Sequence, residues 1–210
     1  MFGAELATTA GQIVILNGTP RAGKTSIAHA VQGLMPGLWL NLGLEMFKSA
    51  TPEPYQPGLG LRPGGERPDL EAWVETLYLA MYDSIAAHSR RGVNVVADTT
   101  HHDHYSAPRH ILPKCAQLIR ELPVLIVGVR CPVDVIMQRR IATWGRGYNN
   151  DGTIPDPILR WQRDAHVPGI YDVEVDSSIT TPEDAAHLIH GYLMERRPAL
   201  AVKQLAALLG

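Results

Sequence analysis

One stretch of the chain, an apolar run followed by a glycine-rich turn, restricts the possible fold of the protein more than any other. Residues 12–17 are largely apolar, and the chain continues Gly18-Thr19-Pro20-Arg21-Ala22-Gly23-Lys24-Thr25-Ser26. This matches G-x-x-x-x-G-K-[ST], a loop whose backbone N–H groups and lysine surround phosphate oxygens and whose last hydroxyl binds Mg²⁺. A buried strand before the loop and a helix after it supply the required context. We therefore predict that residues 18–26 bind a nucleoside triphosphate, with Lys24 at the phosphates and Thr25 at the metal; the alternative is a purely structural turn.

Short apolar runs alternate with helical patterns along the rest of the chain. The apolar runs predict strands at 12–17, 38–42, 93–98, 123–129 and 171–175. Three- and four-residue periodicity, caps and first-turn acids predict helices at 69–90, at 132–143, from 181–184 onward and within 198–210. Because such continuous apolar strands are covered on both faces, the alternation predicts an α/β fold. We expect a three-layer P-loop NTPase or kinase fold with a five-stranded parallel sheet.

Composition excludes several classes of protein. The 210 residues are 45% hydrophobic, which suits a single domain spanning 1–210. The net charge of −2 indicates no nucleic-acid partner, and no long apolar run indicates a membrane span. Cys115 and Cys131 lack metal-type spacing, so we expect a reduced, cytoplasmic chain. Nothing in the sequence indicates the oligomeric state.

Other segments separate the classes of nucleotide-binding protein. The strand ends at 129–132 and 175–178 lack the Asn/Thr-Lys-x-Asp pattern with which a GTPase reads guanine. Instead, a segment rich in proline and glycine extends a substrate-side loop over about 46–68, and arginines begin a lid over about 139–156. These features predict a kinase that uses ATP and Mg²⁺ on a small hydroxylated molecule.

Two groups of charged residues are candidates for the nucleotide site. Asp98 follows the apolar run 93–97, so it is expected at the carboxyl end of a strand, where it binds Mg²⁺; a turn aspartate is the alternative. Arg139 and Arg146 are expected to close over the triphosphate from the lid, and Arg140 is a weaker candidate for the same role. A solvated basic helix face is the alternative for the arginines.

Several segments beyond the phosphate loop resemble the chloramphenicol phosphotransferase family. They are Trp39-Leu40-Asn41-Leu42-Gly43, Leu70-Glu71-Ala72-Trp73, Val127-Gly128-Val129-Arg130-Cys131, His166, and Tyr171-Asp172-Val173-Glu174-Val175-Asp176. Their order and spacing match the family over about residues 12–192. The resemblance implies ATP-dependent phosphorylation of a hydroxyl group, in the known case on an antibiotic, and it aligns Arg139 and Arg146, but not Arg140, with family arginines.

Glu45 is where the chain departs from this family. The family has its proposed catalytic aspartate at the corresponding position, so the resemblance implies that Glu45 accepts the proton of the acceptor hydroxyl. The longer side chain moves the carboxylate by over an ångström unless the backbone adjusts. Glu45 could instead hold Mg²⁺ through water or serve as an acidic first-turn residue of a helix. Chloramphenicol itself is therefore one candidate acceptor among related antibiotics.

Two further features leave alternatives open. The run His101-His102-Asp103-His104 follows Asp98 and matches no zinc pattern, so we expect a site rim, or a solvated loop as the leading alternative. The acceptor is expected between the segments 46–65 and 99–110. The alternative functions are a zeta-toxin-like kinase that acts on an activated amino sugar, and a regulator that binds ATP without turnover.

Overall fold

The computed structural model of the chain describes residues 9–145, 147–195 and 199–209. Five strands form its sheet: β1 (Ile13–Asn17), β2 (Trp39–Asn41), β3 (Asn94–Thr99), β4 (Val124–Arg130) and β5 (Val173–Asp176). The strand order is β2-β3-β1-β4-β5, and all four pairings are parallel. The expected five-stranded parallel sheet is confirmed, and each strand lies within two residues of its predicted limits.

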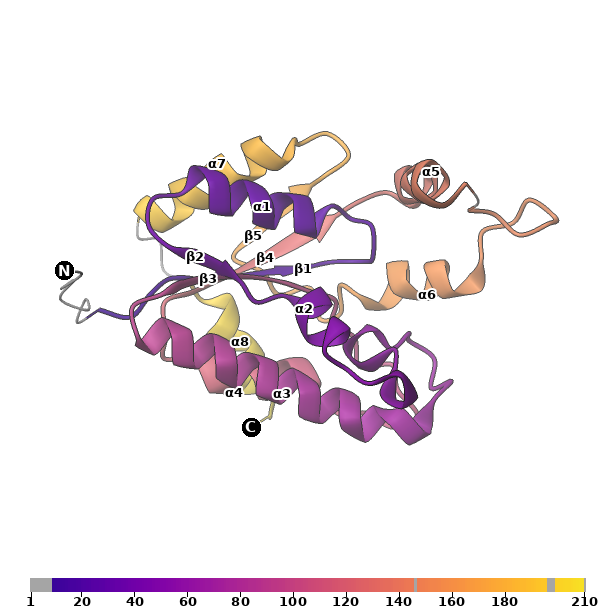
Figure 1. The fold of residues 1–210 in the computed structure, drawn as a ribbon, viewed down its shortest axis with the longest axis horizontal. Coiled ribbons are helices and arrows are strands. Elements are labelled where there is room, and N and C mark those ends of the chain that lie inside the picture. Colours follow the sequence, from indigo (N-terminus) through magenta and orange to yellow (C-terminus); the bar gives the residue numbers. More distant parts are fainter. Residues whose placement is uncertain (1–8, 146, 196–198, 210) are drawn as a thin grey trace.

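Helices cover both faces of this sheet (Figure 1). One layer contains α1 (Lys24–Leu34) and α7 (Pro182–Met194), and the other contains α3 (Pro68–Arg90), α4 (Ile111–Ile119) and α8 (Ala201–Ala206). Three helices lie toward the carboxyl ends of the strands: α2 (Leu44–Ser49), α5 (Val133–Trp144) and α6 (Asp156–Asp164). Short 3₁₀ turns occur at Glu53–Tyr55, Gly58–Gly60 and Ala207–Leu209. The fold is the three-layer α/β arrangement that the sequence predicts.

The apolar strands supply a separate core to each layer. Ile13 and Ile15 of β1 pack in the α3–α4–α8 layer, whereas Val14 and Leu16 pack in the α1–α7 layer. Successive side chains of a strand point to opposite faces, so a strand between two helical layers needs apolar residues at every position. The continuous apolar run before the phosphate loop has this physical cause.

The central position of β1 determines where the site forms. From β1 the chain builds β2 and β3 on one side and then crosses to β4 and β5 on the other. Loops that leave neighbouring parallel strands in opposite directions open a crevice at the carboxyl ends of the strands. The phosphate loop joins β1 to α1 at that crevice, at the right in Figure 1.

The structure differs from expectation in several connecting segments. The expected substrate-side loop, 46–68, begins inside α2 and contains two 3₁₀ turns, and the expected lid, 139–156, begins inside α5. Helix α6 was not predicted at all. Among the described residues, no helix combines the length and apolar character needed to cross a bilayer.

The C-terminal segment, predicted as a short helix, contains α8 and the last 3₁₀ turn. Val202 and Leu205 of α8 are buried in the core of the α3–α4–α8 layer. Asp172 caps the helix, because its Oδ1 accepts hydrogen bonds from the backbone N–H groups of Leu200 and Ala201 at 2.8 and 2.9 Å. Helix α8 is therefore an integral part of that layer.

Candidate active site

The phosphate loop owes its shape to two glycines. A Cβ at Gly18 would collide with the carbonyl oxygen of Val129 on β4, so only glycine fits there. Gly23 has φ 89°, in the left-handed region, and α1 begins directly after it at Lys24. The positive end of α1 therefore points at the space that the loop surrounds.

Lys24 lies over the loop with its side chain buried. Its Nζ donates hydrogen bonds to the carbonyl oxygens of Gly18 and Thr19, both at 2.8 Å. Burial lowers the pKa of Lys24 from 10.5 to about 8, and the carboxylates of Asp98 and Glu45 partly oppose this effect. At neutral pH the site therefore presents a desolvated positive charge, which suits the binding of phosphate oxygens.

Thr25 and Asp98 come together as a pair of oxygen ligands. Asp98 lies beside Leu16 in the β3–β1 register, and its Oδ2 accepts a hydrogen bond from Thr25 Oγ1 at 2.7 Å. The backbone of Gly43 packs so closely on this carboxylate that a Cβ there would overlap Asp98 Oδ1. A hydroxyl and a carboxylate are hard donors of the kind that Mg²⁺ prefers, so these two residues can hold that ion.

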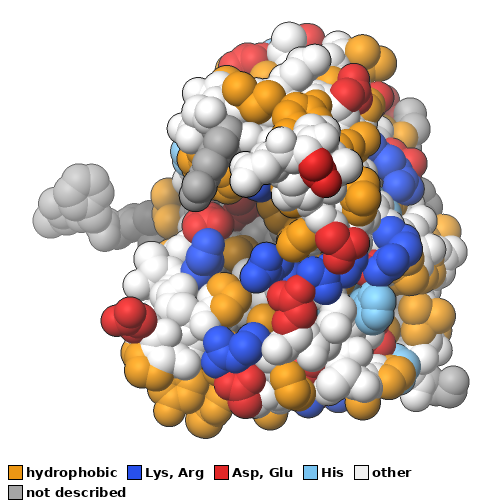
Figure 2. Space-filling view, turned by 90° about the vertical axis from the view of Figure 1, so that its right-hand side faces the viewer, with side chains coloured by type: hydrophobic (Ala, Val, Ile, Leu, Met, Phe, Trp, Pro, Cys, Tyr) orange, Lys and Arg blue, Asp and Glu red, His pale blue; other side chains and the backbone are white. Residues whose placement is uncertain are grey.

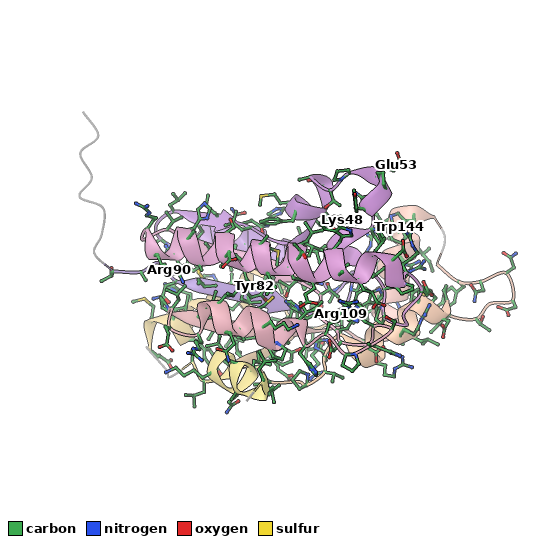
Figure 3. All side chains as sticks on the ribbon, turned by 90° about the horizontal axis from the view of Figure 1, so that it is seen from below. Lys48, Glu53, Tyr82, Arg90, Arg109 and Trp144 are labelled. Carbon is green, nitrogen blue, oxygen red and sulfur yellow. The ribbon has the colours of Figure 1, made fainter. Side chains whose placement is uncertain are left out.

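A cavity of about 810 Å³ joins these groups. Of the predicted site residues, it is lined by Pro20, Arg21, Gly23, Lys24, Thr25, Ser26, Glu45, Asp98 and Arg139. Thr19 lines a neighbouring pocket, Ala22 is buried, and Arg146 lies outside the described residues. Figure 2 faces this end of the molecule and shows Lys and Arg side chains in a band across its middle. Two further residues that line the cavity, Lys48 and Trp144, are labelled in Figure 3, away from the end that carries Arg90.

Glu45 enters the cavity from the first turn of α2. Its side chain is 67% exposed, and its Oε2 lies 3.6 Å from Nζ of Lys48. Glu45 and Asp98 thus lie on the same cavity as Lys24 but differ in environment, because the Asp98 side chain is buried. An accessible carboxylate beside a phosphate site can accept a proton from a bound hydroxyl group.

Arg139 braces the loop in this structure. Its Nη1 donates to the carbonyl oxygen of Arg21 at 3.1 Å and to Ser177 Oγ at 3.2 Å, and its Nη2 donates to the carbonyl oxygen of Ser177 at 2.6 Å. The guanidinium of Arg21 stacks on Trp144 at 3.9 Å from the ring centroid, and Arg21 Nη1 donates to Thr143 Oγ1 at 2.9 Å. Helix α5 is thereby attached to the phosphate loop.

Asn17 is a connecting residue that the sequence did not single out. This buried side chain accepts a hydrogen bond from the backbone N–H of His101 at 2.9 Å. It donates to the carbonyl oxygen of Ala165 at 2.8 Å and to Tyr171 Oη at 3.0 Å. His166 Nδ1 lies 2.8 Å from the same Tyr171 hydroxyl, which gives His166 a structural partner. The available signal was an amide at the last position of a buried strand, directly before the loop.

The expectation of a solvated loop is wrong for two of the histidines. His101 and His102 are 1% and 3% exposed. His101 Nε2 lies 2.9 Å from Tyr82 Oη, and His102 Nε2 lies 2.9 Å from the carbonyl oxygen of Leu61. Burial lowers the pKa of His101 to about 3, so this side chain is neutral. Of the segment after Asp98, Thr100 lines the cavity.

Comparisons with known proteins agree with this geometry. A family model described as chloramphenicol phosphotransferase-like protein matches residues 11–194. Two Mycobacterium tuberculosis proteins, each named as an O-phosphotransferase, are 29% identical over 201 residues, which cover 86% of this chain and 81% of each relative.

Solved structures share the fold at low sequence identity. The shikimate kinase of Acinetobacter baumannii aligns with a TM-score of 0.59 at 13% identity, over 90% of this chain and 96% of that one. The APS kinase of Mycobacterium tuberculosis aligns with a TM-score of 0.53 at 13% identity, over 89% and 99%. The tunicamycin resistance protein of Deinococcus radiodurans aligns with a TM-score of 0.54 at 17% identity, over 87% and 95%. These likenesses establish a P-loop kinase fold.

Proposed function

Because the chain belongs to the chloramphenicol phosphotransferase-like family and is a phosphotransferase of P-loop type, we propose that it transfers the γ-phosphoryl group of ATP to a hydroxyl group of a small molecule. One observation carries the proposal: Lys24, the Thr25–Asp98 pair and Glu45 line one cavity. The cavity thus combines groups suited to phosphates, to a metal ion and to a hydroxyl proton.

The direction of the substrates in the cavity follows from its lining. On one side the cavity is lined by residues between the end of β5 and the first turn of α7, namely Ser177, Thr180 and Pro182. On the side of α2 and α6 it is lined by Glu45 and Trp161. The γ-phosphate must lie near the metal ligands, so the base of ATP extends toward Ser177 and Pro182. The acceptor then enters from the side of Glu45 and Trp161.

The proposed transfer needs no covalent enzyme intermediate. Glu45 accepts the proton of the acceptor hydroxyl, whose oxygen forms a bond to the γ-phosphorus as the bond from that phosphorus to the β–γ bridging oxygen breaks. Lys24 holds the phosphate oxygens, and Thr25 and Asp98 would hold Mg²⁺, which neutralises phosphate charge when bound. Arg139 and Arg146 are proposed to act from the lid, Arg139 by holding the loop in shape.

The finer proposal is an antibiotic acceptor, either chloramphenicol or a related compound, and its test is a direct screen. Purified protein is incubated with ATP, Mg²⁺ and hydroxylated antibiotics or metabolites, ADP release is measured, and mass spectrometry detects an added phosphate. We expect at least one acceptor-dependent product, and none with Lys24→Ala. Tight ATP binding without any acceptor-dependent ADP would instead indicate a regulator. Growth arrest on expression would favour a toxin-type kinase.

A further inference from the structure

A second pocket opens on the outer side of the phosphate loop. Its volume is about 220 Å³, and it lies between that loop, the residues after the Gly58–Gly60 turn, α5 and α6. Pro20 and Trp161 line both this side pocket and the main cavity, so the two spaces share a wall. Trp161 belongs to the wall where the acceptor is proposed to enter. A molecule whose hydroxyl lies near Glu45 can therefore extend past Trp161 into the side pocket.

The side pocket has unused hydrogen-bonding groups. Thr19 is 1% exposed, and its Oγ1 is buried with no hydrogen-bond partner. Nε of Arg140 is likewise buried without a partner. Buried polar groups are rarely left unsatisfied, so two of them on residues that line one pocket indicate that this pocket binds a polar ligand or water.

The charges around the pocket favour an anion. Within the described part of the chain, no carboxylate lies at ion-pair distance from Arg140, whose guanidinium instead stacks on Trp144 at 4.6 Å. Burial and the nearby charge of Arg21 both lower the pKa of Arg140, as expected for a cation that lacks a counter-ion. Arg62, the second cation among the described residues that line the pocket, is 53% exposed and pairs only loosely with Glu66, at 3.5 Å.

Apart from the amide of Gln162, which donates a hydrogen bond to the carbonyl oxygen of Cys131 at 3.1 Å, the remaining walls are apolar. Ile136, Pro155, Pro157 and Ile158 line the pocket together with the ring of Trp161. Arg139, the neighbour of Arg140, lines the main cavity instead, because consecutive side chains on a helix point about 100° apart. Arg140 is thereby separated from the proposed phosphate contacts and directed to the side pocket.

We propose that the side pocket is the distal part of the acceptor site and that the acceptor carries an acidic oxygen group, a carboxylate or a phosphate ester, held by Arg62 and Arg140. This rests on the proposed function. The guanidinium groups donate hydrogen bonds to the acidic group, Thr19 supplies a further hydroxyl, and the apolar walls cover the adjoining carbon skeleton. The site thus favours acidic over neutral hydroxyl compounds, so among the proposed antibiotic acceptors it favours one with an acidic group over chloramphenicol, which has none.

Matched pairs of compounds test this inference. The probes are hydroxy acids with their methyl esters, and sugar phosphates with the corresponding free sugars. Binding is measured by calorimetry in the presence of a non-hydrolysable ATP analogue, and turnover is measured by ADP release. The wild-type protein is expected to bind at least one acidic compound about 10- to 100-fold more tightly than its neutral partner, the range typical of charge-assisted hydrogen bonds. Comparison of the carboxylate and phosphate pairs identifies the acidic group.

Three variants complete the test. Arg62→Gln and Arg140→Gln are expected to weaken binding of the acid about 10-fold or more and to leave binding of its neutral partner unchanged. The matched control is Arg120→Gln, because Arg120 is an exposed residue at the C-terminal end of α4. This substitution should change the binding of neither compound. Arg62 is exposed, so its loss should leave the melting temperature near that of the wild type.

The possible results separate the two proposals. Equal binding of acids and neutral partners by the wild-type protein, or no acid binding at all, would overturn the acidic-acceptor proposal. Equal weakening of both classes by Arg62→Gln would overturn it as well. Acids that bind in an Arg62-dependent manner but are never phosphorylated would support the acidic site and refute the proposed transfer.

Discussion

The buried charge of Lys24 makes a quantitative prediction about pH. The pKa of Lys24 falls from 10.5 to about 8 on folding, a difference that corresponds to ~3 kcal/mol. Between pH 8 and 10.5 the unfolded chain keeps the proton that the folded protein has lost, so the unfolded state binds more protons. The free energy of unfolding therefore rises with pH, by ~1.4 kcal/mol per pH unit. Below pH 8 the full desolvation cost of the charge is present.

Lys24→Met removes this ionisation and leaves the other titrating groups in place. We expect the unfolding free energy of the wild type, relative to that of Lys24→Met, to increase by ~3 kcal/mol from pH 7 to pH 10.5. Urea denaturation of both proteins at several pH values measures the difference directly. Because other ionisations contribute equally to both proteins, parallel stability curves across this range would refute the buried-charge reasoning.

The same lysine should link ATP binding to proton uptake. Phosphate charges next to Nζ raise the pKa of Lys24, so above pH 8 the nucleotide binds together with a proton. The affinity for ATP is then expected to fall about tenfold per pH unit above pH 8. Calorimetry in two buffers of different ionisation enthalpy counts the proton. An affinity that is constant from pH 8 to 10 would contradict the link.

The remaining predictions concern three other residues. Glu45→Gln should lower kcat about 10²- to 10⁴-fold with ATP binding retained, and Glu45→Asp should be impaired less; full activity of a stable Glu45→Gln protein would remove Glu45 as the base. Gly43→Ala should displace the Asp98 carboxylate and abolish Mg²⁺-dependent turnover, with partial recovery at high Mg²⁺; wild-type metal dependence would show that the loop adjusts. Glu71 is fully buried and accepts hydrogen bonds from Ser106 N at 2.8 Å and Arg109 Nε at 3.3 Å. Glu71→Ala should therefore lower the free energy of unfolding, measured by urea denaturation, by ~3–5 kcal/mol, and a decrease below ~1 kcal/mol would refute this.

The parts of the fold that the sequence predicted correctly depend on local patterns. Strand β1, the phosphate loop and α1 follow one another without interruption, and α3 has a periodic apolar face over 23 residues. Helix α6 has nine residues, with Ile158 and Trp161 buried among charged side chains. It is held by partners far along the chain, such as Glu66, which pairs with Arg160, and His104, which contacts Asp164 at 3.0 Å. Such partners leave no periodic pattern in the sequence.

Prediction of the site reached a similar limit. The convergence of Lys24, Asp98 and Glu45 was predictable because parallel strands end at the same edge of the sheet. The burial of His101 was not, because it depends on Tyr78 and Tyr82, which α3 carries across that strand end from about 20 residues earlier. Likewise, the position of the phosphate loop against α5 decides which of two neighbouring arginines on that helix faces the main cavity.

The position of α8 has a consequence for how the protein forms during synthesis. Helix α8 packs against α4 and β4, and Gln117 Nε2 of α4 donates a hydrogen bond to the carbonyl oxygen of Ala206 at 2.8 Å. Since the N-terminus of a nascent chain leaves the ribosome first, all five strands emerge before α8, the helix that completes the α3–α4–α8 layer. Until then the nascent chain exposes apolar surface that α8 later covers, and chaperones bind surface of this kind. Residues 201–206, which begin 25 positions after the last strand ends at Asp176, thus determine when the protein can finish folding.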